Sequence, residues 1–485
     1  MEKVYPVYLN GQWVRTQKTI RIVNPASGEA FAEVCAVDRA AVAQAISDAH
    51  AAFPGWRALT AKARGEFLHK IAEEMERRRD EIARAITMEN GKPLAQSLAE
   101  MDVAIDHVRW FAEEARRAYG RIIPNQVDGK RHLVIKSPFG VVAAISPWNF
   151  PMFLVTRKIA PALAAGNTVI LKPASATPIC AVLLAECIEA AKLPKGVFQL
   201  VAGPARDIAQ EFLDNPLCRK ITFTGSTEVG RSLITGAAKL IKPLSLELGG
   251  HAPVLVFDDA DLDVAVEGAM ASKFRNTGQS CIAANRFYVQ HGIYDKFLDA
   301  FVAQTRAQKV GDGLEDGVVI GPLINEDGLK KALEHIDDAV KRGARLLCGG
   351  KRLARKGFFL EPTILADVPA DALCMSEETF APVAPVCAFD TEAEAIASAN
   401  RSPYGLSAYA FTRDLARTFR LAEGIEAGTI GINDGVPSTS QCPFGGVKQS
   451  GWGRELGIEG MDAFLETKHI SLGLGAGSTR GPIGE

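Results

Sequence analysis

The sequence lacks the segments that would carry a protein into or across a membrane. No window approaches the roughly 18 uninterrupted apolar residues that a membrane-spanning helix requires. The N-terminus, MEKVYPVYLNGQWV, has no basic stretch followed by an apolar run, so no secretory signal is expected. An excess of one charge sign is also missing, because the formal net charge is only −2. We therefore expect neither nucleic acid nor an anionic membrane surface as a partner.

Cysteine and histidine occur without the spacings that would make them structural. The nine cysteines are an odd number and are scattered without the pattern of a disulfide framework. Such usage is typical of reduced thiols, and we therefore expect a cytoplasmic protein. No group of His with Cys or Glu has zinc-ligand spacing, so no metal site is expected.

What is present is the composition of an ordinary globular protein in a long chain. Hydrophobic residues make up 47% and charged residues 23% of the 485 residues. A chain of this length exceeds one ordinary core. Two large domains and a smaller appendage are therefore expected.

Apolar periodicity predicts helices early in the chain and an alternation of strands and helices later. Residues 41–53 and 66–86 each repeat apolar side chains at helical spacing, so the first third is predicted to be mostly helical. Between residues 140 and 225, four strand candidates are each followed by a helical stretch. A second alternating segment begins near residue 252. This alternation predicts an α/β protein with parallel sheets, which bind ligands beyond the carboxyl ends of their strands.

Polar or glycine-rich residues follow three of the four strand candidates. These are Pro147–Phe150 (PWNF), Lys172–Ser175 (KPAS) and Gly225–Gly230 (GSTEVG). The last resembles a phosphate-cradling turn, in which glycines let the backbone approach an anion at a helix N-terminus. An ordinary tight turn is the alternative, so this stretch alone does not establish a nucleotide site.

Cys281 is the most informative cysteine because its neighbours are polar. It lies in FRNTGQSCIAANR, residues 274–286, whereas Cys180 and Cys187 lie on an apolar helical stretch that is typical of core. A spare buried thiol is the alternative to a nucleophile. A reactive thiol requires the thiolate, so a nucleophile would need a lowered pKa and partial exposure.

Glu247 and Asn149 are candidates for two further chemical roles. Glu247 lies among leucines in LELGG, where burial would raise its pKa and suit it to act as a general base; the alternative is an edge glutamate facing solvent. Asn149 in PWNF could form a turn or donate a hydrogen bond to a developing oxyanion. A cysteine, a carboxylate and an amide donor together indicate acyl chemistry through a thioester, and a nucleotide-binding sheet would make the acyl group arise by oxidation.

Motifs along the chain resemble those of the aldehyde dehydrogenase superfamily. They run in family order from YLNGQWV to LETKHISLG and include PWNFP, LKPASATP, FTGSTEVG, LELGG, FRNTGQSC, EETFAPV and PFGGVKQSG. The resemblance implies an α/β aldehyde dehydrogenase fold with a Rossmann-like cofactor domain, an α/β catalytic domain and a small β arm for oligomerisation. Residue by residue, it implies that Cys281 is the nucleophile, that Asn149 and the Cys281 amide form the oxyanion hole, and that Glu247 activates water.

The resemblance also implies a cofactor, NADP or NAD, and a division of the chain. The matching cofactor-binding positions are Pro147, Trp148, Lys172, Ser175, Gly225, Ser226, Gly230, Leu248, Glu378 and Phe380. The expected parts are an NAD(P)-binding domain (1–119 and 139–250), a catalytic domain (251–440), an oligomerisation arm (120–138 and 465–474), a return segment (441–464) and a Gly-rich tail (475–485). A homodimer or homotetramer is expected.

Within the superfamily the chain is most similar to succinate-semialdehyde dehydrogenases. Arg157, Arg275 and Ser438 match the positions that hold the distal carboxylate of that substrate, and arginine forks suit a carboxylate. A surface ion pair for Arg157 and a structural contact for Arg275 are the alternatives. Another aldehyde, such as 2-oxoglutarate semialdehyde or a neutral aliphatic or aromatic aldehyde, and a CoA-acylating reaction are the alternative functions.

Three positions depart from family patterns. Ser175 stands where many NAD-preferring members have a glutamate that repels a 2′-phosphate, so NADP should be accepted. Ala283 stands where several succinate-semialdehyde enzymes have a second cysteine, so no local disulfide switch is expected. Ala381 replaces a usual glycine, and the sequence does not indicate the effect.

Overall fold

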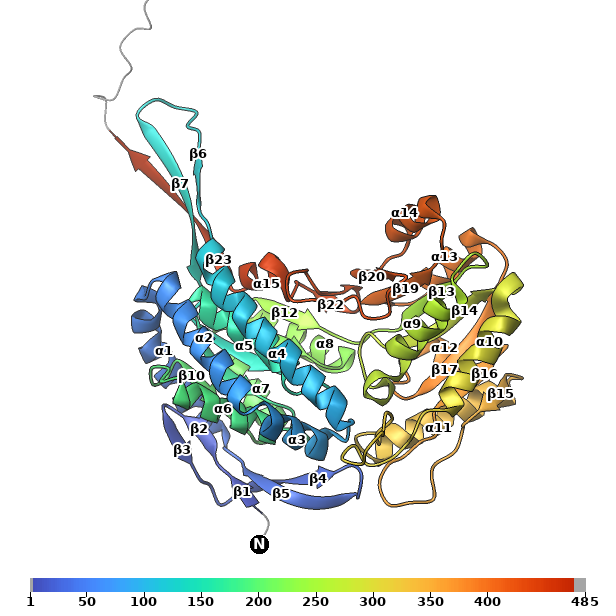
Figure 1. Ribbon diagram of the computed structural model, residues 1–485. Coiled ribbons are helices and arrows are strands. Elements are labelled where there is room, and N and C mark those ends of the chain that lie inside the picture. The colour runs from blue at the N-terminus through green and yellow to red at the C-terminus, as the bar shows by residue number, and fades with distance from the viewer. Residues whose placement is uncertain (1–2, 475–485) are drawn as a thin grey trace, which may run out of the picture.

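The computed structural model describes residues 3–474, which form two sheet-centred units and a projecting arm (Figure 1). The first unit is built on an eight-stranded sheet whose five central strands are parallel. In sheet order its strands are β22 (Gly451–Trp452), β12 (Leu244–Glu247), β11 (Cys218–Thr224), β8 (Val141–Ile145), β9 (Thr168–Lys172), β10 (Phe198–Leu200), β2 (Val7–Leu9) and β3 (Gln12–Val14).

Helices enclose this sheet, and strands β8 and β9 are buried along their whole length. Such burial explains their near-continuous apolar sequences, which are typical of parallel strands covered on both faces. The helices of this unit are α1 (Arg39–Ala58), α2 (Ala61–Arg77), α3 (Arg79–Asn90), α4 (Leu94–Glu114), α5 (Phe153–Ala165), α6 (Ile179–Ala190), α7 (Ala205–Asp214) and α8 (Thr227–Ala237).

Two expectations for the first third of the chain need correction. The single helix predicted over residues 66–86 is two helices, because Arg78 leaves the helical region at φ −106° and ψ 14° between α2 and α3. The chain also begins with strands rather than helices. Besides β2 and β3, a separate sheet contains β1 (Lys3–Tyr5), β5 (Glu29–Cys35) and β4 (Thr19–Asn24).

The second unit is built on a seven-stranded sheet that is parallel except at β15. Its strands, in sheet order, are β15 (Arg345–Cys348), β16 (Thr363–Ala366), β17 (Val383–Phe389), β14 (Ala284–Gln290), β13 (Ala252–Val256), β19 (Ser407–Phe411) and β20 (Thr429–Ile432). Its helices are α9 (Leu262–Phe274), α10 (His291–Arg306), α11 (Glu326–Lys341), α12 (Leu373–Ser376), α13 (Glu392–Asn400) and α14 (Leu415–Gly424).

Late segments of the chain return to the first unit. Strand β22 pairs with β12, and the short helix α15 (Gly457–Asp462) packs against α5. A two-stranded ladder of β18 (Tyr404–Gly405) and β21 (Val447–Lys448) precedes this return. The chain therefore runs from the first unit to the second and back to the first.

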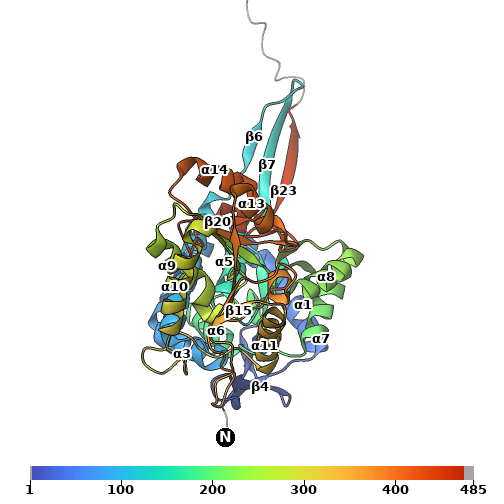
Figure 2. The ribbon, with the colours of Figure 1, turned by 90° about the vertical axis from the view of Figure 1, so that its right-hand side faces the viewer.

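The arm is a three-stranded sheet of β6 (Arg121–Ile123), β7 (Lys130–Pro138) and β23 (Leu465–Gly473), projecting away from both units (Figure 2). β23 pairs with β7 along the full length of both strands, so segments more than 300 residues apart lie side by side. The predicted Gly-rich tail, 475–485, lies outside the described residues. Across residues 3–474, no helix combines the length and apolar character needed to cross a membrane.

Candidate active site

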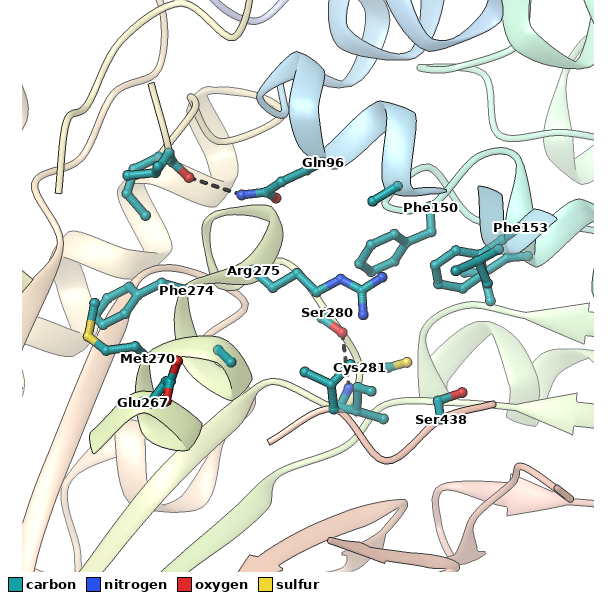
Figure 3. Close-up of a pocket in the computed structure, with 18 of the residues that line it drawn as sticks. Gln96, Phe150, Phe153, Glu267, Met270, Phe274, Arg275, Ser280, Cys281 and Ser438 are labelled. Carbon is teal, nitrogen blue, oxygen red and sulfur yellow. Dashed lines mark hydrogen bonds between the residues drawn. The ribbon is translucent and has the colours of Figure 1, made fainter. Parts of the chain in front are cut away.

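A cavity of about 620 Å³ lies between the two units. Figure 3 shows Arg275, Ser280, Cys281 and Ser438 around it, with aromatic rings of Phe150 and Phe153 nearby. Helices α4 and α5 of the first unit and α9 of the second contribute its walls, together with the loop that follows α9. The residues predicted to hold substrate and the predicted nucleophile therefore share one cavity. Its lining comprises Gln96, Ala99, Val103, Phe150, Phe153, Leu154, Arg157, Glu267, Met270, Ala271, Phe274, Arg275, Ser280, Cys281, Ile282, Gln304, Gln308, Val319, Ile320, Val436, Ser438 and Phe444.

Cys281 is half-buried at the cavity wall, as a nucleophile requires. The low pKa expected of a nucleophilic Cys281 is wrong. Burial raises the pKa of the Cys281 thiol to about 12, and the nearby Glu378 carboxylate adds to the rise, while Arg157 opposes it. The thiol is therefore protonated at neutral pH.

The loop before Cys281 is held in an unusual backbone conformation. Asn276 and Thr277 have φ values of 51° and 59°, in the left-handed region that non-glycine residues rarely adopt. The Asn276 side chain bonds to two carbonyl oxygens, those of Asn149 at 2.8 Å and Gln279 at 3.1 Å. These bonds tie the cysteine loop to the loop that follows β8.

Asn149 is buried beside the cysteine loop. Its amide nitrogen donates to the Gln279 carbonyl at 3.1 Å, and its amide oxygen has no partner within the described chain. A carboxamide nitrogen carries two hydrogens, so one remains for a second acceptor. The structure therefore places an amide donor next to the loop that carries Cys281.

Glu247 ends strand β12 and is buried, which excludes the alternative of an edge glutamate in solvent. Burial raises the pKa of Glu247 well above its usual value, and the neighbouring Glu455 raises it further. One of its oxygens, Oε2, has no hydrogen-bond partner in the described chain. Three residues later, a Cβ added to Gly250 would collide with the Cys281 carbonyl oxygen, so LELGG and the cysteine loop are in direct contact.

A buried ion pair beside Glu247 was not predicted. Lys158 Nζ lies 2.6 Å from Glu455 Oε1, and both charges act on the Glu247 carboxyl. A signal existed in the sequence, because Lys158 and Arg157 are the only charged residues in the otherwise apolar segment Phe153–Ala165. Charged side chains in an apolar helix seldom lack a partner or a function.

Arg157 and Arg275 carry positive charge into the cavity without forming an ion pair. Arg157 is buried on α5, where it donates to Ser438 Oγ at 3.0 Å and its Nε has no partner in residues 3–474. The rings of Phe153 and Phe444 hold its guanidinium at 4.8 and 4.5 Å. Arg275 lies 5.2 Å from the Phe150 ring, and none of the ion pairs in the described chain includes it. A surface ion pair for Arg157 is thus excluded.

The cofactor candidates gather at the carboxyl ends of β9, β11 and β12. Lys172 ends β9, and Ser175 is exposed three residues later. Ser226 caps the N-terminus of α8 through the Val229 amide at 3.4 Å. A Cβ at Gly230 would lie only 2.6 Å from Leu248, so this glycine permits close packing of α8 on the LELGG segment.

Two further cofactor-binding candidates, Glu378 and Phe380, approach this edge of the sheet from the second unit. The Glu378 carboxylate accepts from the Gly250 amide at 3.1 Å, and burial raises its pKa to about 7. Phe380 has a left-handed φ of 55° and meets Trp148, which follows Pro147, edge to face at 5.5 Å. These donors and acceptors fit a dinucleotide: an exposed helix N-terminus suits a pyrophosphate, a lysine and a serine suit ribose, and a carboxylate suits a second ribose.

The model of the aldehyde dehydrogenase family matches residues 13–470, almost the whole chain. The chain belongs to the aldehyde dehydrogenase family. A glutarate-semialdehyde dehydrogenase of Pseudomonas aeruginosa is 51% identical over 96% of this chain and 97% of its own length. An NADP⁺-dependent succinate-semialdehyde dehydrogenase of Escherichia coli is 50% identical over the same shares.

Solved structures with a closely similar fold lead to the same family as the sequence comparisons. An E. coli NADP-dependent enzyme superposes with a TM-score of 0.96 at 50% identity, covering 97% of this chain and 98% of that one. A succinate-semialdehyde dehydrogenase of Burkholderia pseudomallei superposes with a TM-score of 0.96 at 45% identity. The match covers 97% of this chain and 98% of that one. The predicted family and the aldehyde dehydrogenase fold are confirmed.

The structure also bears on Ala381, one of the departures from family motifs. Ala381 is fully buried and, unlike its neighbour Phe380, is not among the residues with positive φ. The replaced glycine is therefore not needed for backbone freedom, and the methyl group joins the apolar core beneath the Glu378 turn.

Proposed function

We propose that this aldehyde dehydrogenase oxidises a semialdehyde with a distal carboxylate, succinate or glutarate semialdehyde, using NADP⁺ or NAD⁺. One observation carries the proposal: Arg157 and Arg275 line the cavity beside Cys281, and neither has a carboxylate partner in the described chain. Burying a guanidinium that has no carboxylate within ion-pair distance is costly, so a substrate carboxylate would complete the site. The names of the relatives support the same substrate class.

The reaction would begin with Cys281. Its thiol would lose its proton to water, and the sulfur would add to the aldehyde carbon as the C=O π bond breaks, forming a thiohemiacetal oxyanion. Asn149 Nδ2 and the Cys281 backbone amide are the donors proposed to hold that oxyanion. Arg157, Arg275 and Ser438 would grip the far carboxylate and so fix the carbonyl against the sulfur.

The cofactor would lie along Lys172, Ser175, Gly225, Ser226, Gly230, Leu248, Pro147, Trp148, Glu378 and Phe380. Bound there, NAD(P)⁺ would supply the hydride acceptor, and the thiohemiacetal carbon held by Cys281 would thereby become the acyl carbon of a thioester. Glu247 then takes a proton from water, and the resulting hydroxide attacks the thioester to release the acid and the thiol. A raised pKa suits Glu247 to this role near neutral pH.

Preference for NADP⁺ follows from the charge around the adenosine ribose. Ser175 is exposed and neutral, Lys172 is cationic, and Lys172 belongs to none of the ion pairs in the described residues. A 2′-phosphate would therefore meet attraction rather than repulsion. The name of the E. coli relative supports this preference.

We also propose a cytoplasmic homodimer or homotetramer assembled through the arm. All nine cysteines are free thiols, as expected in a reducing compartment. On the arm, Ile122, Ile135 and Leu472 expose 75%, 38% and 40% of their surface, which a second subunit could cover. Size-exclusion chromatography with light scattering tests the assembly.

An aldehyde panel with both cofactors tests the proposed activity, with Cys281→Ala as the blank. Succinate or glutarate semialdehyde with NADP⁺ should give the highest kcat/KM, without added CoA. A higher kcat/KM for butanal, benzaldehyde or 2-oxoglutarate semialdehyde would refute the substrate proposal. A strict requirement for CoA would refute hydrolysis by Glu247.

A further inference from the structure

A second fully buried ion pair lies next to the site and has no part in the steps above. Lys92 stands in the link between α3 and α4, and Glu100 lies on α4. Lys92 Nζ is 2.6 Å from Glu100 Oε2, and both side chains are 0% exposed. Such a pair contributes little net stability, because desolvation of both charges offsets their attraction. Its contacts therefore matter more than its own energy.

Both members of the pair form hydrogen bonds with the backbone of the loop that carries Asn149. Lys92 Nζ donates to the Asn149 carbonyl oxygen at 2.7 Å. Glu100 Oε1 accepts from the amides of Met152 at 2.8 Å and Phe153 at 3.3 Å. The pair thus holds this loop at Asn149 and again at the start of α5.

The Asn149 carbonyl is fixed from the cysteine loop as well. Asn276 Nδ2 donates to the same oxygen at 2.8 Å, while Asn149 Nδ2 donates to the Gln279 carbonyl at 3.1 Å. Asn90 Nδ2 also donates to this oxygen, at 3.5 Å, so three side-chain donors on one carbonyl leave its peptide little freedom. The carbonyl and the side chain of Asn149 are both attached to its Cα atom. Holding the carbonyl therefore also restricts the direction of the side-chain carboxamide.

We propose that Lys92 and Glu100 are positioning residues that hold the Asn149 amide at the oxyanion site. This inference rests on the oxyanion role proposed for Asn149 above. Lys92 donates to the Asn149 carbonyl and lies 4.0 Å from the Phe150 ring centroid, while Glu100 accepts from the Met152 and Phe153 amides. Glu100 also acts on the Arg275 guanidinium through its charge, so Lys92 is the member of the pair whose removal tests the loop most directly. Removing either should slow formation and breakdown of the thiohemiacetal rather than weaken binding.

A double-mutant cycle with Asn149 tests the inference. Lys92→Met is made in the native chain and in Asn149→Ala, and the single-turnover rate of NADPH formation is measured with saturating succinate semialdehyde. We expect a loss of about tenfold or more in the native background, with KM within about twofold. In the Asn149→Ala background the further loss should be under about twofold, because the positioned group is already gone.

A matched control separates positioning from loss of a buried amine. Lys242 is also buried and donates to three backbone carbonyls, those of Phe212, Asn215 and Cys218, in a part of the first unit away from the cavity. Lys242→Met should lower Tm as Lys92→Met does while leaving the single-turnover rate within about twofold of native. If Lys92→Met does not fold, the near-isosteric substitution Glu100→Gln replaces it in the same double-mutant cycle with Asn149→Ala.

The outcomes distinguish this inference from the proposed function. Equal fold losses for Lys92→Met or Glu100→Gln in both backgrounds would show a structural role and overturn the positioning inference alone. A native rate in Asn149→Ala would overturn both the oxyanion role and the inference built on it. A large loss in the native background that disappears in Asn149→Ala is the result the structure predicts.

Discussion

Replacing Arg157 should separate recognition of the substrate carboxylate from the chemistry at Cys281. In Arg157→Met, an unbranched apolar chain still fills the space between Phe153 and Phe444, but the charge and the bond to Ser438 are lost. A hydrogen bond to a charged group contributes about 1.5–3 kcal/mol, and a buried charged pair costs more when one partner is removed. With Arg275 remaining to hold part of the carboxylate, we expect a loss of about 3 kcal/mol.

That energy corresponds to a fall of roughly 100-fold in kcat/KM for succinate semialdehyde. The matched substrate is butanal, which has the same chain length and no carboxylate. Its kcat/KM should fall much less, because it loses only the effect of the Arg157 charge on Cys281 and not a carboxylate contact. Arg157→Lys keeps the charge without the planar fork and should give an intermediate loss. Initial rates of NADPH formation at 340 nm measure all three. Equal losses for both aldehydes would refute carboxylate recognition by Arg157.

Further predictions concern the cofactor, the base and the thiol. Ser175→Glu should lower kcat/KM for NADP⁺ about tenfold and spare NAD⁺, because a carboxylate repels the 2′-phosphate; an unchanged cofactor ratio would contradict the assignment. Since the pKa of Glu247 is raised well above its usual value, the carboxylate that activates water forms only at higher pH than for an ordinary glutamate, so thioester hydrolysis should accelerate as pH rises. A flat profile in quenched-flow measurements would oppose that role. With the Cys281 pKa raised to about 12, iodoacetamide should alkylate the ligand-free enzyme about tenfold faster per pH unit between pH 7 and 9; a plateau in that range would contradict the raised pKa.

The sequence predicted the parts of the site that follow from local pattern. Strands β8 and β9 appear as largely apolar runs, and β11 appears as the strand candidate KITFT before a glycine-containing turn. Parallel strands bring their carboxyl ends to one edge, so PWNF, KPAS and GSTEVG could be assigned to the same edge of the sheet. Polar surroundings singled out Cys281, and apolar ones singled out Glu247. Motif resemblance then supplied the family, the fold and the proposed substrate contacts.

Properties that depend on distant partners could not be predicted in this way. The Lys158–Glu455 pair joins residues 297 positions apart, and Lys92 reaches the Asn149 carbonyl across 57 positions. The high pKa of Cys281 comes from burial between two units, which its polar neighbours in sequence do not indicate. Helices α2 and α3 separate at Arg78, although their apolar residues continue at helical spacing.

The most direct test of the account is to trap the acyl-enzyme. Glu247→Gln removes the proposed base without removing the thiol, so one turnover with succinate semialdehyde and NADP⁺ should release one NADPH per active site and then stop. Mass spectrometry of peptides from the quenched protein should find one succinyl group, on Cys281 alone. Steady turnover by Glu247→Gln at the native rate, or a succinyl group on any other residue, would contradict the proposed thioester mechanism.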